Sequence, residues 1–341
     1  MSMFKKSAIA TAIVIAAYEV GTRWWETQRI EKNFNYWRNL CTPDVAERAE
    51  CLRQSYDISS TGIRIHIDTY PQPNANAPVL IFNHGVRSYG RMMAGLIMGF
   101  YDQGYTVVAG DRIGQGFSGG QRGVMTFEQN AQNAVDIARW TKTRFGTPVF
   151  MFGTSMGGPV TYCATAQGAP IDAIACFNLY DFSPGSPDIP DLFGTLAQRF
   201  STRFWFLLKP LSWVRLPWKK VNAKAWASVI DEREPHMNAI WSKDSLPLNF
   251  MSLKFIISLA NSAPLIPFAQ NQLPVLVINP NRDRMSDPAI TQRNYERLGG
   301  PKHYAEVPYG HYAFAEGFGR SIAEAADPWF KQHGLEKARG K

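Results

Sequence analysis

Residues 150–166 read FMFGTSMGGPVTYCATA, and this stretch decides the fold prediction. An apolar run typical of a buried strand leads into the glycines, and an alanine-rich run typical of a helix follows them. Glycine this dense weakens both helix and strand, so a sharp turn between the two is the arrangement that needs it. Gly153 to Gly157 form the pattern G-x-S-x-G, which in a strand–turn–helix context presents Ser155 on a strained bend above the sheet. The alternative interpretation is an ordinary Ser-Gly loop that starts a helix.

The rest of the body alternates strand and helix. Continuous apolar runs predict strands buried on both faces, and strict apolar–polar alternation predicts a half-buried strand. The expected strands are 62–70, 77–85, 105–111, 148–153, 173–179, 273–280 and 302–308, and the expected helices are 90–103, 126–145, 156–167, 287–298 and a last one ending near 330. This order predicts an α/β fold with a mostly parallel sheet that helices cover on both faces.

The alternation stops between residues 182 and 250, where the chain becomes aromatic, basic and broken by prolines. We interpret 182–250 as a helical cap or lid inserted after the sixth strand. Residues 55–181 and 251–335 then form the core. Residues 26–54 are expected to be a helical linker, and residues 1–25 a separate hydrophobic segment.

That N-terminal segment places two lysines before an apolar run from Ser7 to Val20, followed by Trp24 and Trp25. We interpret it as a membrane anchor, which predicts a membrane-associated protein, although the run is short and contains Glu19. Two alternatives stay open. One is a signal peptide cut near Ala16, which predicts a secreted or periplasmic protein, and the other is a helix packed on the protein's own surface.

A nucleophilic serine needs a base, and the base needs an acid that orients it. In a strand–turn–helix fold of this kind both are expected later in the chain, acid first, each on a loop after a strand. Asp283 comes just past the strand at 273–280, and His311 lies in a Gly-His loop just past the next strand. The sequence therefore predicts the triad Ser155, Asp283 and His311. Asp287 and Asp181 are the alternative acids, ranked lower because Asp283 lies closest to its strand end.

Acyl chemistry also needs two backbone N–H groups for the oxyanion. The residue after the nucleophile, Met156, supplies one, and Val86 in the loop after an early strand is the candidate for the other. His84 and Gly85 let that loop turn tightly and brace it, as Gly153 and Gly157 support the bend around Ser155. The four cysteines show no metal-ligand spacing, so neither a metal nor a cofactor is predicted.

Four stretches together resemble the α/β-hydrolases, and within them the monoacylglycerol lipase, lysophospholipase and serine aminopeptidase S33 group. They are His84-Gly85-Val86, GDRIGQGFSGGQRG at 110–123, the bend around Ser155 at 153–158 (the elbow), and the Asp283 and His311 pair. The resemblance covers roughly residues 55 to 335 and implies an α/β-hydrolase fold with a cap. Thr154 and Gln115 replace histidines that are usual in the group, and an Asn-Pro-Asn-Arg run precedes Asp283 where His-Gly is usual.

The cap region carries an apolar stripe at every fourth residue from Leu192 to Leu208. Further aromatic residues with interleaved lysine and arginine surround this stripe, a combination that suits a membrane interface as well as a cap packed on the core. The residues predicted to face substrate or membrane are Phe204, Trp205, Trp213 and Trp218.

These features predict a serine hydrolase that cleaves carboxylic esters of lipid-like substrates through an acyl-enzyme intermediate, a lipase or lysophospholipase. Its expected partners are the lipid-like ester and a membrane surface. The formal net charge is +8, but the basic residues are scattered without a nucleic-acid-reading motif, so no nucleic acid is expected. A peptidase or amidase, an acyltransferase and a catalytically silent lipid-binding relative are the alternatives. Acyl chain length, natural substrate and oligomeric state stay open.

Overall fold

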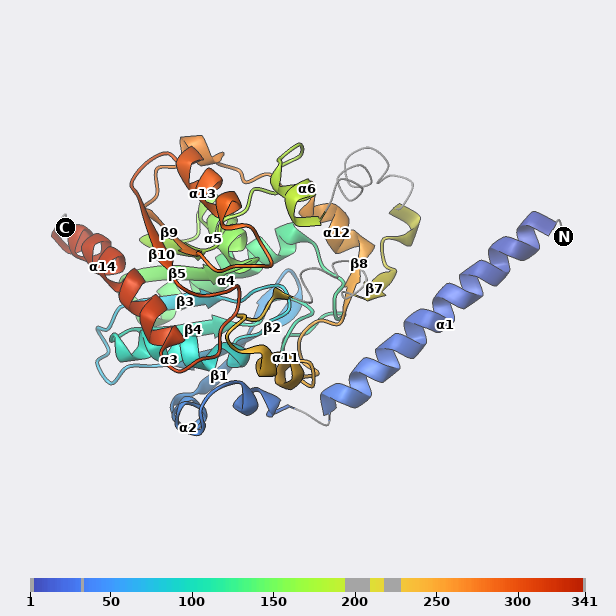
Figure 1. Cartoon of the computed structure of the whole chain (residues 1–341), viewed down its shortest axis with the longest axis horizontal. Coiled ribbons are helices and arrows are strands. Elements are labelled where there is room, and N and C mark those ends of the chain that lie inside the picture. The colour runs from blue at the N-terminus through green and yellow to red at the C-terminus, as the bar shows by residue number, and fades with distance from the viewer. Residues whose placement is uncertain (1–2, 32–33, 194–208, 218–227, 340–341) are drawn as a thin grey trace.

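A computed structural model describes residues 3–31, 34–193, 209–217 and 228–339. Its centre is an eight-stranded sheet in the order β1-β2-β4-β3-β5-β6-β9-β10 (Figure 1). The strands are β1 (Gln54–Ser60), β2 (Ile63–Tyr70), β3 (Val79–Asn83), β4 (Thr106–Gly110), β5 (Val149–Thr154), β6 (Ala173–Phe177), β9 (Val275–Pro280) and β10 (Lys302–Val307). The β1–β2 and β2–β4 pairs are antiparallel, and the other pairs are parallel. The predicted mostly parallel α/β fold is confirmed.

Two hydrophobic clusters cover the two faces of the sheet. Strand β5 shows how the sequence divides between them: Val149 and Met151 join one cluster, while Phe150 and Phe152 join the other. Successive side chains of a strand point to opposite faces, so a strand buried on both sides must be apolar throughout. The helices of the body are η1 (Tyr36–Leu40), α2 (Pro43–Leu52), η2 (Arg91–Met93), α3 (Ala94–Asp102), α4 (Phe127–Phe145), α5 (Gly157–Ala166), α13 (Pro288–Arg297) and α14 (Phe318–Arg339).

Strand β1 was not expected from the sequence. It forms a hairpin with β2 through Thr61 and Gly62, whose φ angles of 52° and 76° are both left-handed. Of its seven residues only Ser60 is fully buried. Because β1 lies at the edge of the sheet and its residues are largely polar, it lacks the apolar run that marked the other strands.

The segment between β6 and β9 holds α6 (Asp188–Phe193), η3 (Lys209–Leu211), β7 (Arg215–Pro217), α11 (Pro235–Trp241), β8 (Phe250–Ser252), α12 (Leu253–Leu259) and η4 (Phe268–Gln270). Strands β7 and β8 pair with each other as a separate antiparallel ribbon. Most of the stripe predicted from Leu192 to Leu208 lies outside the described residues. The division of the chain at 182 and 250 stays a prediction.

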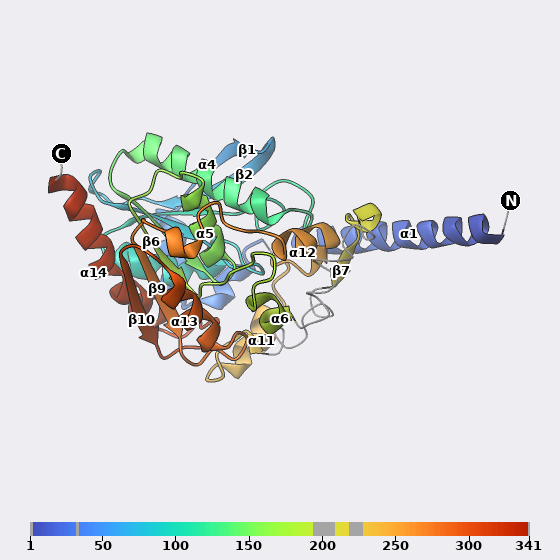
Figure 2. The same cartoon turned by 90° about the horizontal axis from the view of Figure 1, so that it is seen from above.

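Helix α1 (Met3–Glu31) extends away from the body, and its N-terminal end and the C-terminal end of α14 lie at opposite ends of the molecule (Figures 1 and 2). Glu19, near the end of its apolar run, and Glu26, beyond the run, are buried and bind Arg215 of β7. Among the described residues, no helix combines the length and apolarity that crossing a membrane requires. The prediction of a membrane-associated protein held by this segment is therefore wrong. The apolar run is too short, and the helix continues as a mixed one that binds the protein's own insertion.

Candidate active site

Ser155 lies at the turn from β5 into α5 with a φ of 53°, a left-handed conformation that is strained for a residue with a side chain. Its N–H donates to the Phe177 carbonyl at 2.8 Å, which fixes the bend to the neighbouring strand β6. A methyl group at Gly157 would overlap the carbonyl oxygen of Asn83, and one at Gly153 would overlap the carbonyl of Gly157. Only glycine lets the start of α5 pack this closely on the loop after β3.

Three side chains from separate loops meet at this bend. His311 Nε2 lies 2.8 Å from Ser155 Oγ, and His311 Nδ1 lies 2.7 Å from Asp283 Oδ2. All three residues are buried, with His311 only 1% exposed. A histidine held in this way between a carboxylate and a hydroxyl can take the hydroxyl proton and carry the resulting charge beside the carboxylate.

The contacts of the three candidate acids separate them. Asp283 Oδ1 accepts hydrogen bonds from the backbone N–H groups of Met285 and Ser286, at 2.8 and 3.0 Å, which leaves Oδ2 for His311. Asp287 instead accepts from the Ala289 N–H at the start of α13. Asp181 forms an ion pair with Arg297 at 2.8 Å.

Asn178 is a member of the site that sequence reasoning missed. It directly follows β6 with a φ of 69°, and its amide donates to Asp283 Oδ2 at 3.3 Å. The Asn178 carbonyl would be overlapped by a methyl group at Gly158, so the residue is locked between α5 and the acid loop. A polar residue just past a strand was the available signal, but its role depends on packing against two other loops.

Met156 follows Ser155 directly in the chain, and Val86 lies in the loop after β3. Within the described part of the chain, the backbone N–H of neither residue donates a hydrogen bond to another protein group. Gly85, next to Val86, packs so that a methyl group on it would lie 3.3 Å from Ser155 Cβ. The loop after β3 thus approaches the serine directly, and the oxyanion role of the two N–H groups stays a prediction.

His84 braces that loop from inside. Its Nδ1 lies 2.7 Å from the Gly85 carbonyl, and its Nε2 accepts from the Arg112 N–H at 3.3 Å. Burial and then the positive charge of Arg112 hold the pKa of His84 well below its usual value, so its ring is neutral at pH 7.

Arg112, inside the 110–123 run, was not singled out from the sequence. Its guanidinium donates to the carbonyls of His84 and Gly85 at 2.5 and 3.0 Å. These bonds tie the carbonyls of the loop after β3 to the 110–123 run. The neighbouring Asp111 ties the run together by accepting from the Gly90 and Phe117 N–H groups.

The His311 loop is held by the insertion. The Asp231 carboxylate accepts from the Gly310 N–H at 2.6 Å, and Glu234 accepts from the Phe314 N–H at 2.7 Å. Arg233 pairs with Asp231 at 2.8 Å. The segment between β6 and β9 in the chain therefore helps to position the His311 loop.

Of the four residues predicted to face substrate or membrane, one lies among the described residues. Phe204, Trp205 and Trp218 lie outside the described residues. Trp213 is 41% exposed, and its indole N–H donates to the Pro210 carbonyl at 3.1 Å. Their assignment to substrate or membrane stays a prediction.

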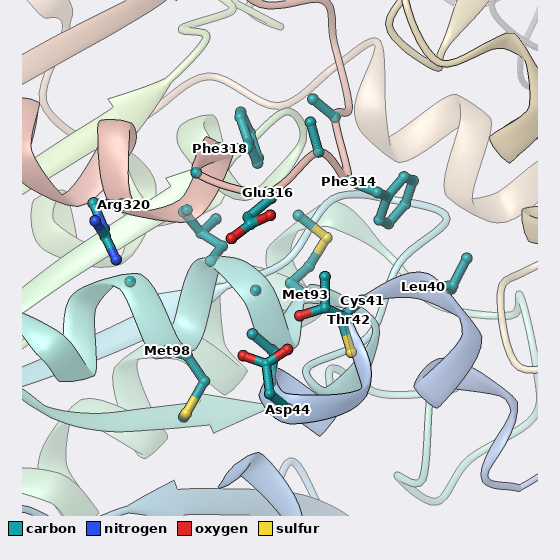
Figure 3. A pocket seen from close by; sticks show the side chains of 18 of the residues that line it. Leu40, Cys41, Thr42, Asp44, Met93, Met98, Phe314, Glu316, Phe318 and Arg320 are labelled. Atoms are coloured by element: carbon teal, nitrogen blue, oxygen red, sulfur yellow. The ribbon is translucent and has the colours of Figure 1, made fainter. Parts of the chain in front are cut away.

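A pocket of 310 Å³ lies between residues 40–48, 92–102 and 313–320. Asp44, Met93 and Glu316 line it, one from each segment (Figure 3). Its lining includes none of the triad residues. Burial raises the pKa of the Cys41 thiol in its wall to about 11, so that thiol is protonated at neutral pH. Within the described residues, His, Cys, Asp and Glu form no cluster that could hold a metal ion.

The sheet order and the strand–elbow–helix unit define an α/β-hydrolase. Residues 74–312 match the sequence profile of the serine aminopeptidase S33 family, and the chain belongs to that family. The resemblance seen in the sequence is confirmed. An uncharacterised 31.7 kDa protein of the traX–finO intergenic region of Escherichia coli is 23% identical over 274 residues, covering 77% of this chain and 93% of the relative.

Solved structures share the fold at low identity. The α/β-hydrolase GrgF from Penicillium sp. sh18 superposes with a TM-score of 0.64 at 20% identity, covering 83% of this chain and 99% of that one. The monoacylglycerol lipase of Paleococcus ferrophilus gives 0.58 at 19%, with 82% and 99% covered. A soluble variant of the Saccharomyces cerevisiae monoglyceride lipase, in complex with a substrate analogue, gives 0.62 at 16%, with 82% and 96% covered. Family and neighbours support an esterase- or lipase-like α/β-hydrolase.

Proposed function

We propose that this protein is a serine hydrolase that cleaves carboxylic esters of lipid-like substrates through an acyl-enzyme intermediate. The observation that carries the proposal is the continuous contact from Asp283 through His311 to Ser155, which lies on a strained bend. A buried Ser–His–Asp contact has no structural purpose that simpler packing would not serve. Strain of this kind is retained where a side chain must be presented for chemistry.

The proposed reaction has two halves. Ser155 Oγ attacks the ester carbonyl while His311 Nε2 takes the serine proton. Asp283 accepts a hydrogen bond from the His311 Nδ1–H and stabilises the charged imidazole. The Val86 and Met156 N–H groups hold the oxyanion; one such donor is worth roughly 100- to 1000-fold in kcat. His311 then gives its proton to the leaving alcohol. In the second half, His311 activates a water that releases the acid and restores Ser155.

Two observations bear on the substrate. Neighbours of similar fold include monoacylglycerol lipases, which favours a monoacylglycerol-like ester. The family match to serine aminopeptidases favours peptide hydrolysis as the second candidate. The same triad performs both reactions, so the leaving group decides between them. Comparing the rates at which the protein hydrolyses a monoacylglycerol and an aminoacyl anilide distinguishes an alcohol leaving group from an amine.

Covalent labelling with a fluorophosphonate tests the proposal. We expect wild type to be modified at Ser155 and Ser155→Ala not to be. Ser262→Ala is the matched control, because Ser262 is a buried serine whose hydroxyl bonds to Glu128 instead of a histidine. This control should label like wild type. A folded wild-type protein that the probe does not modify at Ser155 would contradict the proposed hydrolase.

A further inference from the structure

Tyr312, directly after His311, places its hydroxyl at the nucleophile. It is 3% exposed. A methyl group at Gly85 would overlap the Tyr312 hydroxyl oxygen and would lie 3.3 Å from Ser155 Cβ. The phenol oxygen therefore occupies the space between the loop after β3 and the serine, a position that no motif of the sequence assigned.

The backbone on either side holds the tyrosine there. The Tyr312 N–H donates to the Val229 carbonyl at 2.9 Å, and the Tyr312 carbonyl accepts from the Asp231 N–H at 2.7 Å. These two bonds form a parallel bridge to Ile230 of the insertion. The ring of Tyr312 also packs on the His311 imidazole, with centroids 5.1 Å apart. The hydroxyl is thus held in place before any substrate arrives.

Two buried arginines set the charge around the phenol. Arg112 and Arg87 are 1% and 5% exposed, and their positive charges act on Tyr312. Burial nevertheless raises the pKa of Tyr312 above its usual value, because desolvation outweighs the two arginines. At neutral pH the side chain is therefore a neutral O–H donor in a positive field, and it keeps its proton during the reaction.

We propose that Tyr312 is a further catalytic residue, whose O–H stabilises the negative charge that develops on Ser155 Oγ during attack. The inference rests on the proposed function. In the resting site Ser155 Oγ lies 2.8 Å from His311 Nε2 and donates its proton there, which leaves its lone pairs available to the nearby Tyr312 hydroxyl. As that proton moves to His311 Nε2, charge builds on Oγ and the Tyr312 O–H donates a hydrogen bond to it. The tyrosine forms and breaks no covalent bond.

Tyr312→Phe tests this role, since it keeps the ring and removes only the hydroxyl. We expect kcat on a soluble ester to fall about 10- to 100-fold, the effect of one hydrogen bond to a charged group. KM should stay nearly constant, because the lost partner is Ser155 and not the substrate. The rate of fluorophosphonate labelling should fall in parallel. Tyr309→Phe is the control, since Tyr309 lies in the same loop and its hydroxyl bonds to Ser321 at 3.1 Å.

A double-mutant cycle with Gly85→Ala tests the placement independently. In the wild-type background the new methyl group overlaps the Tyr312 hydroxyl, whereas the next ring atom is 3.0 Å away. Gly85→Ala should therefore cost a smaller factor in kcat in the Tyr312→Phe background than in wild type. Tyr312→Phe with wild-type kcat and labelling rate would overturn the inference and leave the proposed hydrolase intact. A wild-type protein unlabelled at Ser155 would overturn the hydrolase itself.

Discussion

Arg215→Ala should release helix α1 from the body. Arg215 is 1% exposed, and its partners on α1, Glu19 and Glu26, are 2% and 4% exposed. The Arg215 Nε lies 3.0 Å from Glu19 and its Nη1 lies 2.5 Å from Glu26. Its backbone N–H also donates to Glu19, and its Nη2 to the Thr22 hydroxyl. Removing this guanidinium leaves two carboxylates in the interior.

The size of the effect on α1 follows from the partners that Glu19 and Glu26 keep once Arg215 is removed. Breaking a buried ion pair by removing one partner costs about 3–5 kcal/mol, because the other charge stays buried. Glu19 keeps Arg23 at 3.5 Å, so the larger cost falls on Glu26. Separation of α1 lets both carboxylates reach water and relieves that cost. At about 1.4 kcal/mol per tenfold, the opening equilibrium of α1 should rise at least about 100-fold.

Hydrogen exchange measures that opening. Amides between Tyr18 and Glu26 should exchange faster in Arg215→Ala, because a helix without packing partners frays in water, while β5 amides should be unaffected. The variant Arg215→Met with Glu19→Gln and Glu26→Gln removes all three charges and should recover most of the protection. Arg139→Ala, which breaks an exposed pair with Asp136, is the control and should change little. Equal exchange in Arg215→Ala and wild type would refute the reasoning.

The destabilisation caused by Arg215→Ala should depend on pH. Burial already raises the pKa of Glu26 above 4.5, and Arg215 opposes that rise. Without Arg215 the pKa rises further, so the folded protein binds a proton that the unfolded chain lacks. The stability that this proton supplies is fully present below the unfolded value of 4.5 and is lost as pH rises through the folded pKa. The destabilisation of Arg215→Ala should therefore be largest at neutral pH and shrink in acid.

Three further predictions concern the site. Asp283→Asn should lower kcat on a soluble ester by several orders of magnitude, with Asp181→Asn and Asp287→Asn close to wild type; a larger loss in either of those would reassign the acid. Gly157→Ala should lower the free energy of unfolding by about 1–3 kcal/mol and abolish turnover, because its methyl group overlaps the Asn83 carbonyl. Unchanged turnover would contradict the packing described. The pKa of Asp231 is lowered to about 2 by its hydrogen bonds to Arg233 and to the Arg233 and Gly310 N–H groups, although burial opposes them. Its contribution is thus present above pH 3.8 and lost as pH falls toward 2. Asp231→Asn should therefore be less stable than wild type at pH 7, with the gap in melting temperature closing below pH 3.8; a gap independent of pH would argue against this.

The parts of the fold that the sequence predicted are those whose determinants are local. A strand buried on both faces must be apolar throughout, and so β3, β5, β6 and β9 were visible as runs of apolar residues. The elbow was visible because close packing at Gly153 and Gly157 permits no side chain. Strand β1 carries only Tyr56 and Ile58 as partly buried apolar residues, and its pairing with β2 depends on a turn at Thr61 and Gly62.

The members of the site that escaped prediction act through contacts between distant segments. Asn178 touches Asp283, which follows it by 105 residues, and Asp231 lies 79 residues before Gly310. Each is an ordinary polar residue near the end of a strand or in a loop, and the sequence holds many of those. Tyr312 was adjacent to a predicted residue, yet its hydroxyl matters only because Gly85 leaves room for it.

Helix α1 shows how an apolar window can mislead. The run from Ser7 to Val20 suggested a membrane anchor because hydropathy averages over all sides of a helix. The deciding residues are Glu19, Thr22 and Glu26, spaced three and four apart, which places them on one face of a helix. Two carboxylates and a hydroxyl in that arrangement are suited to surround a single guanidinium, and Arg215 supplies it from nearly 200 residues away. The spacing of the polar residues, more than the count of apolar ones, carried the information about what this helix binds.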